Sequence, residues 1–163
     1  MFKFWYGLYT LYRVAALEPL PPETLCMDIN PKLIEQIRIH EGVRQFPYVD
    51  TVGKLTIGVG HNLTDNGLSF PIIDALLRED LERVHTDLDA FYPEWCELSE
   101  NRRMVLVNMG FNLGIPRLQT FKKFWSAIKD GNYQLAAAEM LDSRWAKQVG
   151  NRATELSRQM IDG

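Results

Sequence analysis

The fold of this 163-residue chain is decided by residues 41–61, EGVRQFPYVDTVGKLTIGVGH. Two carboxylates, Glu41 and Asp50, stand nine residues apart, and Thr56 follows six residues after the second. The segment between them predicts a β-hairpin with residues 51–53 as its turn, so the three side chains could line one cleft. Two carboxylates that face each other can cut a glycosidic bond: one protonates the leaving oxygen, and the other assists a water or attacks the sugar.

The second strand of this hairpin, expected over residues 54–60, contains two glycines. Gly58 and Gly60 alternate with aliphatic residues. Because glycine weakens a strand, the pair indicates that another group approaches the backbone closely, with a β-bulge as the alternative. The polar residues 61–67 then predict a loop.

A short helix is expected just before the hairpin. Asn30 is a good N-cap, Pro31 suits the first helical position, and aliphatic residues follow with helical spacing. Gly42 should terminate this helix, so that Glu41 projects from its end and is held rigidly by the packed face behind it.

The rest of the chain predicts helices. Ser69 should cap a long helix to about Phe91, whose apolar stripe and length of roughly 20 residues suit a connector between two lobes. Further helices are expected from Ser99 to a stop at Gly114 and Pro116, and over about 118–130, 133–142 and 144–161, the last with a break at Gly150.

The composition is that of a folded protein, with 46% hydrophobic and 24% charged residues. No apolar run approaches the roughly 20 residues of a membrane span. The two cysteines, Cys26 and Cys96, are expected to be free thiols, although sequence leaves their pairing open. No metal-ligand spacing is present, so we expect neither a metal nor a cofactor.

The net charge of −3 is unevenly spread along the chain. Residues 31–100 hold 6 basic and 13 acidic residues, a net of −7, and residues 101–163 hold 10 basic and 5 acidic residues, a net of +5. A basic half could hold a polyanion such as a bacterial wall polymer, or it could be ordinary solvated surface. Nucleic acid is not expected as a partner, because no nucleic-acid motif is present.

The first 27 residues differ from the remainder. Six aromatic residues crowd the first dozen positions, and Met27 stands directly before the first good helix start. We interpret residues 1–27 as an extension of a domain over 28–163. It could be a signal-anchor, an interfacial helix that contacts a membrane, or translation from an upstream start codon.

Three runs together carry a family resemblance: residues 39–44 (IHEGVR), 48–50 (YVD) and 53–61 (GKLTIGVGH). They resemble the signature of the phage-type lysozymes, the T-even phage endolysin family, and residues 108–114, 143–145 and 151–152 resemble its later segments. The resemblance covers about residues 28–161. The chain departs from the family in a shorter loop between His61 and Ser69 and in its aromatic extension.

The resemblance implies an α+β, lysozyme-like fold with a cleft between two lobes. A small α+β lobe with a β-hairpin would span about 31–70, a connecting helix about 70–91, and a larger all-helical lobe about 94–163. It also implies cleavage of the β-1,4 bond between N-acetylmuramic acid and N-acetylglucosamine in peptidoglycan.

The resemblance assigns roles to the three residues of the decisive stretch. Glu41 would be the general acid, Asp50 its ionised partner, and Thr56 the residue that holds the attacking water, which fits an inverting reaction. An apolar wall should raise the pKa of Glu41, whereas the family arginine at Arg152 should lower it. His61 is expected to form a structural pair with Asp80 rather than to act in catalysis.

We expect other positions to shape the cleft, to lie at the surface or to belong to the core. Leu63 and Phe111 would shape the saccharide cleft, although an aromatic there could equally be core. Phe124 and Glu139 stand where the family has small polar sugar contacts, so those contacts are not carried over. His40 and His85 should lie at the surface, and Trp125 and Trp145 in the helical core.

The expected function is therefore a muramidase used for phage-induced lysis, a monomer made in the host cytoplasm that acts on the cell wall. A lytic transglycosylase on the same fold is the alternative, but it needs no water-positioning pair. A non-catalytic wall-binding module is a third hypothesis, against which the intact Glu–Asp–Thr set argues.

Overall fold

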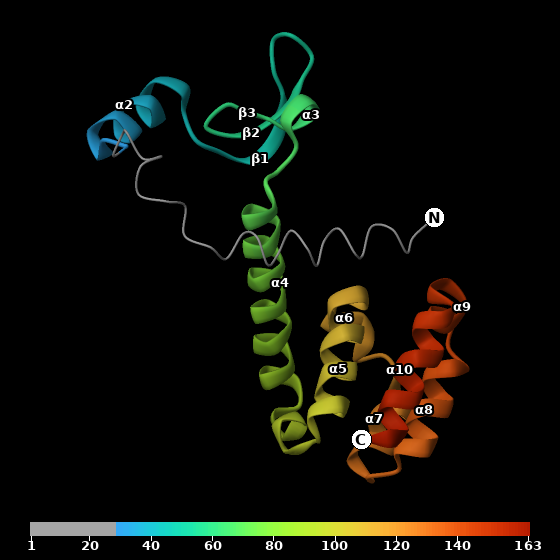
Figure 1. Ribbon diagram of the computed structural model, residues 1–163. Helices are drawn as coiled ribbons and strands as arrows, with labels where there is room; N and C mark the ends of the chain where they lie inside the picture. The colour runs from blue at the N-terminus through green and yellow to red at the C-terminus, as the bar shows by residue number, and fades with distance from the viewer. Residues whose placement is uncertain (1–28) are drawn as a thin grey trace, which may run out of the picture. The chain divides into compact units, whose positions relative to one another are not determined.

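The computed structural model describes residues 29–163 and divides the chain into two units, one ending at Gly67 and one spanning Leu68–Gly163 (Figure 1). The predicted extension with Cys26, and the membrane contact proposed for it, lie outside the described residues. No helix within residues 29–163 is both long enough and apolar enough to span a membrane.

The described part of the first unit, residues 29–67, is a small antiparallel sheet with two helices. It comprises α2 (Pro31–Glu41), β1 (Arg44–Val49), β2 (Leu55–Gly58), β3 (His61–Asn62) and α3 (Leu63–Asn66), with the strand order β1-β2-β3. Tyr48 pairs with Thr56, and Val49 pairs with Leu55. Because successive side chains point to opposite faces of a sheet, Thr56 and Leu55 lie on different faces.

The helix α2 begins and ends where the sequence predicts. The side chain of Asn30 accepts a hydrogen bond from the backbone of Lys32, and Gly42 is the C-cap. The packing expected behind Glu41 is not formed among the described residues of the first unit and stays a prediction. Among the described residues none of α2 is buried, and its apolar side chains Leu33, Ile34 and Ile37 are 49%, 41% and 43% exposed.

The structure gives a further reason for the two glycines near the end of β2. Gly58 and Gly60 have φ angles of 69° and 80°, and a Cβ at either position would meet no atom of this chain within 4 Å. The left-handed backbone there favours glycine by itself, and the close approach of another group stays a prediction. The expected polar loop is instead β3 and α3, because the Asn62 side chain caps α3 through the backbone of Asp65 at 3.0 Å.

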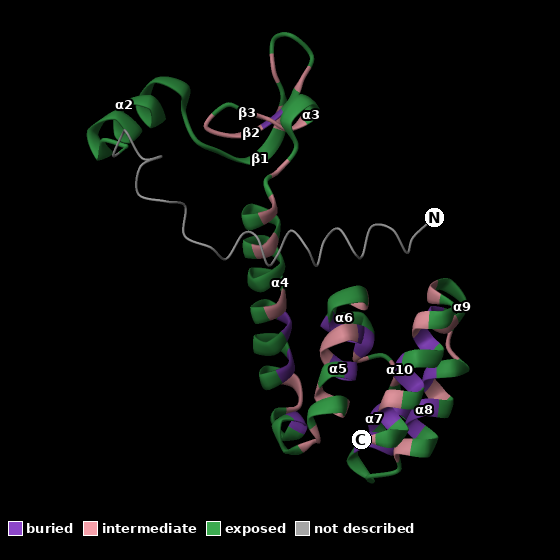
Figure 2. Ribbon diagram, viewed as in Figure 1, coloured by how far each residue is buried: buried purple, intermediate pink, exposed green. Residues whose placement is uncertain are grey.

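The second unit is entirely helical. Its elements are α4 (Phe70–Phe91), the 3₁₀ helix η2 (Pro93–Glu97), α5 (Glu100–Leu113), α6 (Ile115–Leu118), α7 (Lys122–Lys129), α8 (Tyr133–Leu141), α9 (Arg144–Val149) and α10 (Asn151–Asp162). The α10 helix packs on α8 and α5, α7 packs on α8, and α4 packs on α5. Figure 2 shows buried residues gathered in α7, α8 and α10 and along one side of α4.

The expected helix over 118–130 is divided in the structure. Leu118 ends α6, the Thr120 hydroxyl donates to the backbone oxygen of Arg117 at 2.7 Å, and α7 begins only at Lys122. Pro116 does not stop a helix but lies in the first turn of α6, where its missing N–H costs nothing. The break at Gly150 is confirmed, since α9 ends and α10 begins on either side of it.

The helical core predicts a large effect of truncating Leu88, which is fully buried in α4. We expect Leu88→Ala to lower the free energy of unfolding by about 3 kcal/mol, because the substitution removes apolar contacts and leaves a cavity. Urea denaturation followed by tryptophan fluorescence measures this. The control is Leu141→Ala, a 45% exposed position in α8, which should lose less than about 1 kcal/mol. Equal losses in both variants would contradict this description of the core.

Candidate active site

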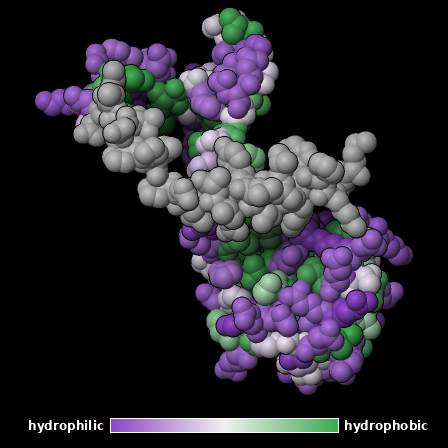
Figure 3. All heavy atoms as spheres, viewed as in Figure 1, coloured by the Kyte–Doolittle hydropathy of each residue, from purple (hydrophilic) through white to green (hydrophobic). Residues whose placement is uncertain are grey.

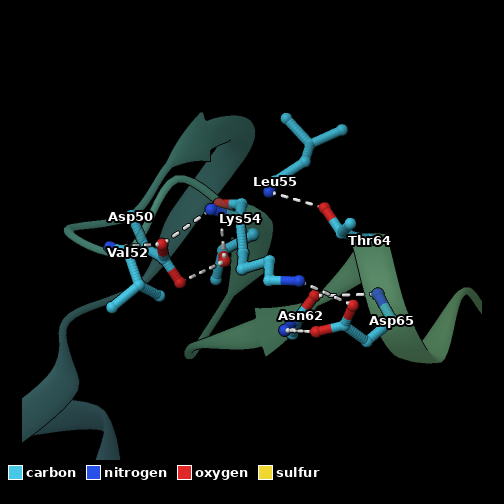
Figure 4. Close-up of polar contacts among 8 residues, drawn as sticks. Asp50, Val52, Lys54, Leu55, Asn62, Thr64 and Asp65 are labelled. Carbon is cyan, nitrogen blue, oxygen red and sulfur yellow. Dashed lines mark hydrogen bonds and ion pairs between the residues drawn. The ribbon is translucent and has the colours of Figure 1, made fainter.

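Asp50 lies directly after β1, at the start of the hairpin turn. Its Oδ1 accepts hydrogen bonds from the backbone N–H groups of Val52 at 2.9 Å and of Lys54 at 2.8 Å (Figure 4). Because Oδ1 is held by the turn, the other oxygen, Oδ2, is left to face Thr56. The turn thus fixes the orientation of the carboxylate.

Thr56 is a buried polar residue of the small sheet, with 3% of its surface exposed. Its hydroxyl lies 3.5 Å from Asp50 Oδ2 and 3.3 Å from the backbone oxygen of Lys54. Both distances are long for an O–H···O hydrogen bond, which is usually 2.5–3.0 Å. The hydroxyl and Asp50 Oδ2 therefore have bonding capacity to spare, and together they could hold one water molecule.

Glu41 is the last residue of α2 and is exposed. It follows Arg38 and His40 in the last turn of that helix. His40 is exposed as well, which confirms that prediction. The structure therefore places all three predicted catalytic residues in the first unit, and it brings Asp50 and Thr56 into contact.

The residues predicted to support the site have different partners in the structure. The ring Nε2 of His61 lies 2.6 Å from the backbone oxygen of Gly67, so His61 braces the end of the first unit. Asp80 forms an ion pair with Arg83 at 3.4 Å. Arg152 donates from Nε to Asn108 Oδ1 at 2.9 Å. The pairing of His61 with Asp80 and the approach of Arg152 to Glu41 stay predictions.

Of the two predicted cleft residues, Leu63 begins α3 and is half-buried. Phe111 lies in α5, is 42% exposed, and lines a cavity of about 460 Å³ with Leu77, Trp95 and Met104. Their roles in saccharide binding stay predictions.

On the face drawn in Figure 3, hydrophilic residues predominate over the second unit, with hydrophobic residues between them.

The predictions that Trp125 and Trp145 lie in the helical core and His85 at the surface are confirmed. Trp125 and Trp145 are 4% and 1% exposed, and their indole N–H groups donate to the Leu118 backbone oxygen and to Asn112 Oδ1, both at 2.8 Å. His85 is exposed and meets the Trp95 ring edge-on.

Two further side chains of the second unit were not expected to contact sugar. Phe124 is 1% exposed and belongs to the helical core, and Glu139 lies 4.0 Å from Lys123. Cys96 is an exposed free thiol whose Sγ lies 3.9 Å from Asp89 Oδ1.

Residues 38–160 match the family model described as phage lysozyme. The chain belongs to the phage lysozyme family. Its mostly helical structure with one small antiparallel sheet is the lysozyme-like α+β fold that the sequence predicted. Members of this family are glycoside hydrolases that degrade peptidoglycan.

Individual relatives are distant. The chain is 26% identical to a probable T4-type lysozyme of Dictyostelium discoideum, over 75% of this chain and 89% of that protein. It is 28% identical to an endolysin of Acyrthosiphon pisum secondary endosymbiont phage 1, over 80% and 88% of the two chains. It is 27% identical to the pre-baseplate central spike protein of Enterobacteria phage T4, over 88% of this chain but only 30% of that protein.

Sequence reasoning missed several polar residues around the site of this phage lysozyme. The sequence predicts a loop at Asn62, Thr64 and Asp65, yet these residues fasten α3 to the hairpin. The signal that could have found them is an asparagine three residues before an aspartate, a spacing typical of a helix N-cap. The Trp145–Asn112 and Arg152–Asn108 hydrogen bonds gave no such local signal, because their partners are 33 and 44 residues apart.

Proposed function

We propose that this phage lysozyme hydrolyses the β-1,4 bond between N-acetylmuramic acid and N-acetylglucosamine in peptidoglycan, with inversion at the anomeric carbon. The observation that carries the proposal is the Asp50–Thr56 pair. A carboxylate oxygen and a buried hydroxyl lie 3.5 Å apart and have bonding capacity for a water molecule. Family membership supports the wall as the substrate.

In the proposed reaction Glu41 donates its proton to the glycosidic oxygen as the bond to the anomeric carbon breaks. Asp50 accepts a proton from the attacking water, and Thr56 orients that water. The water oxygen then forms the new bond to the anomeric carbon from the opposite side. The proton that Asp50 gains balances the proton that Glu41 gives up, and solvent exchange restores both groups.

Hydrolysis is favoured over the transglycosylase alternative by the same pair. A transglycosylase closes an anhydro ring with the sugar's own hydroxyl and has no use for a protein-held water. A wall-binding module without catalysis would require neither the Asp50 carboxylate nor the Thr56 hydroxyl.

We further propose that the enzyme is a monomer, made in the bacterial host cytoplasm, that degrades the wall during phage-induced lysis. The similarity to a protein named endolysin supports this role. The spike protein is matched over only 30% of its length, so its assembly is not carried over to this chain.

Analysis of the products from purified peptidoglycan tests this function. We expect mass spectrometry to find fragments with hydrated reducing ends, and proton NMR at early times to find the α-anomer, because a single displacement by water inverts a β-bond. A heat-inactivated sample is the control.

Three results would contradict the proposal in different ways. Anhydro-muramic ends would identify a transglycosylase. Hydrated ends in the β-configuration would indicate a retaining reaction through a covalent glycosyl-enzyme intermediate, instead of direct attack by the held water. Absence of any cleavage by the folded protein would favour the binding module.

A further inference from the structure

We infer that Lys54 and Asp65 form a brace that holds Asp50 and Thr56 in position. Lys54 and Asp65 are therefore positioning residues for the reaction. This inference rests on the proposed function, because it assumes that Asp50 and Thr56 hold the water. It goes beyond that function by assigning a role to an ion pair that does not contact the reacting atoms.

The backbone of Lys54 hydrogen-bonds Asp50 and lies close to the Thr56 hydroxyl. Its N–H donates to Asp50 Oδ1 at 2.8 Å, and its carbonyl oxygen accepts from the Asp50 N–H at 2.9 Å. The same carbonyl oxygen lies 3.3 Å from the Thr56 hydroxyl. A shift of the Lys54 backbone would therefore move Asp50 and Thr56 relative to each other.

The side chain of Lys54 ties this backbone to α3. Its Nζ lies 2.9 Å from Asp65 Oδ1, and Asp65 Oδ2 accepts from Asn62 Nδ2 at 2.8 Å (Figure 4). A second tie runs beside it, because the Leu55 N–H donates to Thr64 Oγ1 at 2.8 Å. The hairpin arm that carries the site is thus held to one helical turn at two successive residues.

The brace joins the strand side of an exposed turn to a second element. Residues 51–53 are exposed, and Gly53 has a φ of 83°. The turn's own hydrogen bonds run back to Asp50, because the N–H groups of Val52 and Gly53 donate to its side chain and to its backbone oxygen. The two ties from Lys54 and Leu55 connect the hairpin to α3 directly after this turn.

The ion pair is not expected to contribute much to stability. The side chains of Lys54 and Asp65 are 39% and 52% exposed, and pairs at such positions are worth little in folding free energy. Its effect should therefore appear in the chemical step, since small displacements of reacting groups reduce catalysis strongly. We therefore expect loss of the ion pair to lower activity while leaving the free energy of unfolding nearly unchanged.

The test uses the full chain and soluble peptidoglycan fragments. We expect Lys54→Met to lower kcat about three- to tenfold with KM within about twofold of wild type, and Asp65→Asn to do the same. The kcat of the double variant should be no lower than that of the less active single variant, because the two residues act through one contact. Lys54→Arg should restore most of kcat, since it keeps the cation.

The matched control is Lys129→Met, which removes an exposed lysine whose Nζ lies 5.7 Å from the centre of the Tyr92 ring. It should leave kcat and KM unchanged, and thermal unfolding should show all five variants folded. Wild-type kcat in Lys54→Met, a change in KM alone, or additive losses in the double variant would overturn the inference.

The failure of this inference can be told from failure of the proposed function. If wild type hydrolyses the wall and Lys54→Met is fully active, the brace is wrong while the function stands. If wild type gives no hydrated products, the proposed function itself fails, and the brace fails with it.

Discussion

Replacing Glu41 by Gln should lower kcat on peptidoglycan by about 10²–10⁴-fold, the usual contribution of a general acid. Glutamine has nearly the same shape as glutamate but no proton to give to the leaving oxygen. Because Glu41 is exposed at the end of α2, the substitution should leave the unfolding midpoint unchanged. Release of soluble fragments from purified walls measures the loss.

The matched control is Glu35→Gln, the same substitution at another exposed position of α2. It should retain wild-type kcat. Wall sedimentation should show that Glu41→Gln still binds peptidoglycan, because the proton is needed only in the transition state. Normal wall cleavage by Glu41→Gln would show that another group is the acid and would require a new assignment.

Asp50→Asn should lower kcat by about 10²-fold or more, because an amide cannot accept a proton from the attacking water. Its carbonyl oxygen can still accept the hydrogen bonds from Val52 and Lys54 that hold the turn. The hairpin should therefore remain intact while the chemistry is lost. Steady-state kinetics on soluble fragments should show the loss in kcat with little change in KM.

Asp87→Asn is the control for this substitution, at an exposed position of α4 with no role in the proposed site. It should be fully active. If Asp50→Asn instead unfolds at a much lower temperature than wild type, its loss of activity would reflect a damaged turn. If it keeps wild-type kcat, Asp50 is not the base, and the proposed inverting reaction loses its support.

The sequence by itself determined the elements whose causes are local. The N-cap at Asn30, the cap at Ser99 and the break at Gly150 were all predicted, because each depends on a side chain or a backbone preference at that residue. The family resemblance implied the lysozyme-like fold class. The hairpin with its turn at residues 51–53 was predicted from its local pattern, and the structure shows that it pairs Tyr48 with Thr56.

The prediction from sequence was wrong at residues 61–67, where two local signals compete. Residues 61–67 are polar, and polarity indicates a loop, but the capping hydrogen bonds of Asn62 and the glycine turn before it produce a strand and a helical turn. The exposed apolar face of α2 is a different case. Helical periodicity predicts that such a face exists, but it does not say what, if anything, covers it.

The tertiary structure alone decided which distant side chains share a hydrogen bond. The brace from Lys54 to Asp65 joins residues 11 apart, and the Arg152–Asn108 bond joins residues 44 apart. No periodicity or cap predicts such pairs, because their geometry depends on how whole elements pack. The sequence thus identified the residues that carry the proposed chemistry, and the fold determined the contacts that hold Asp50 and Thr56 in place.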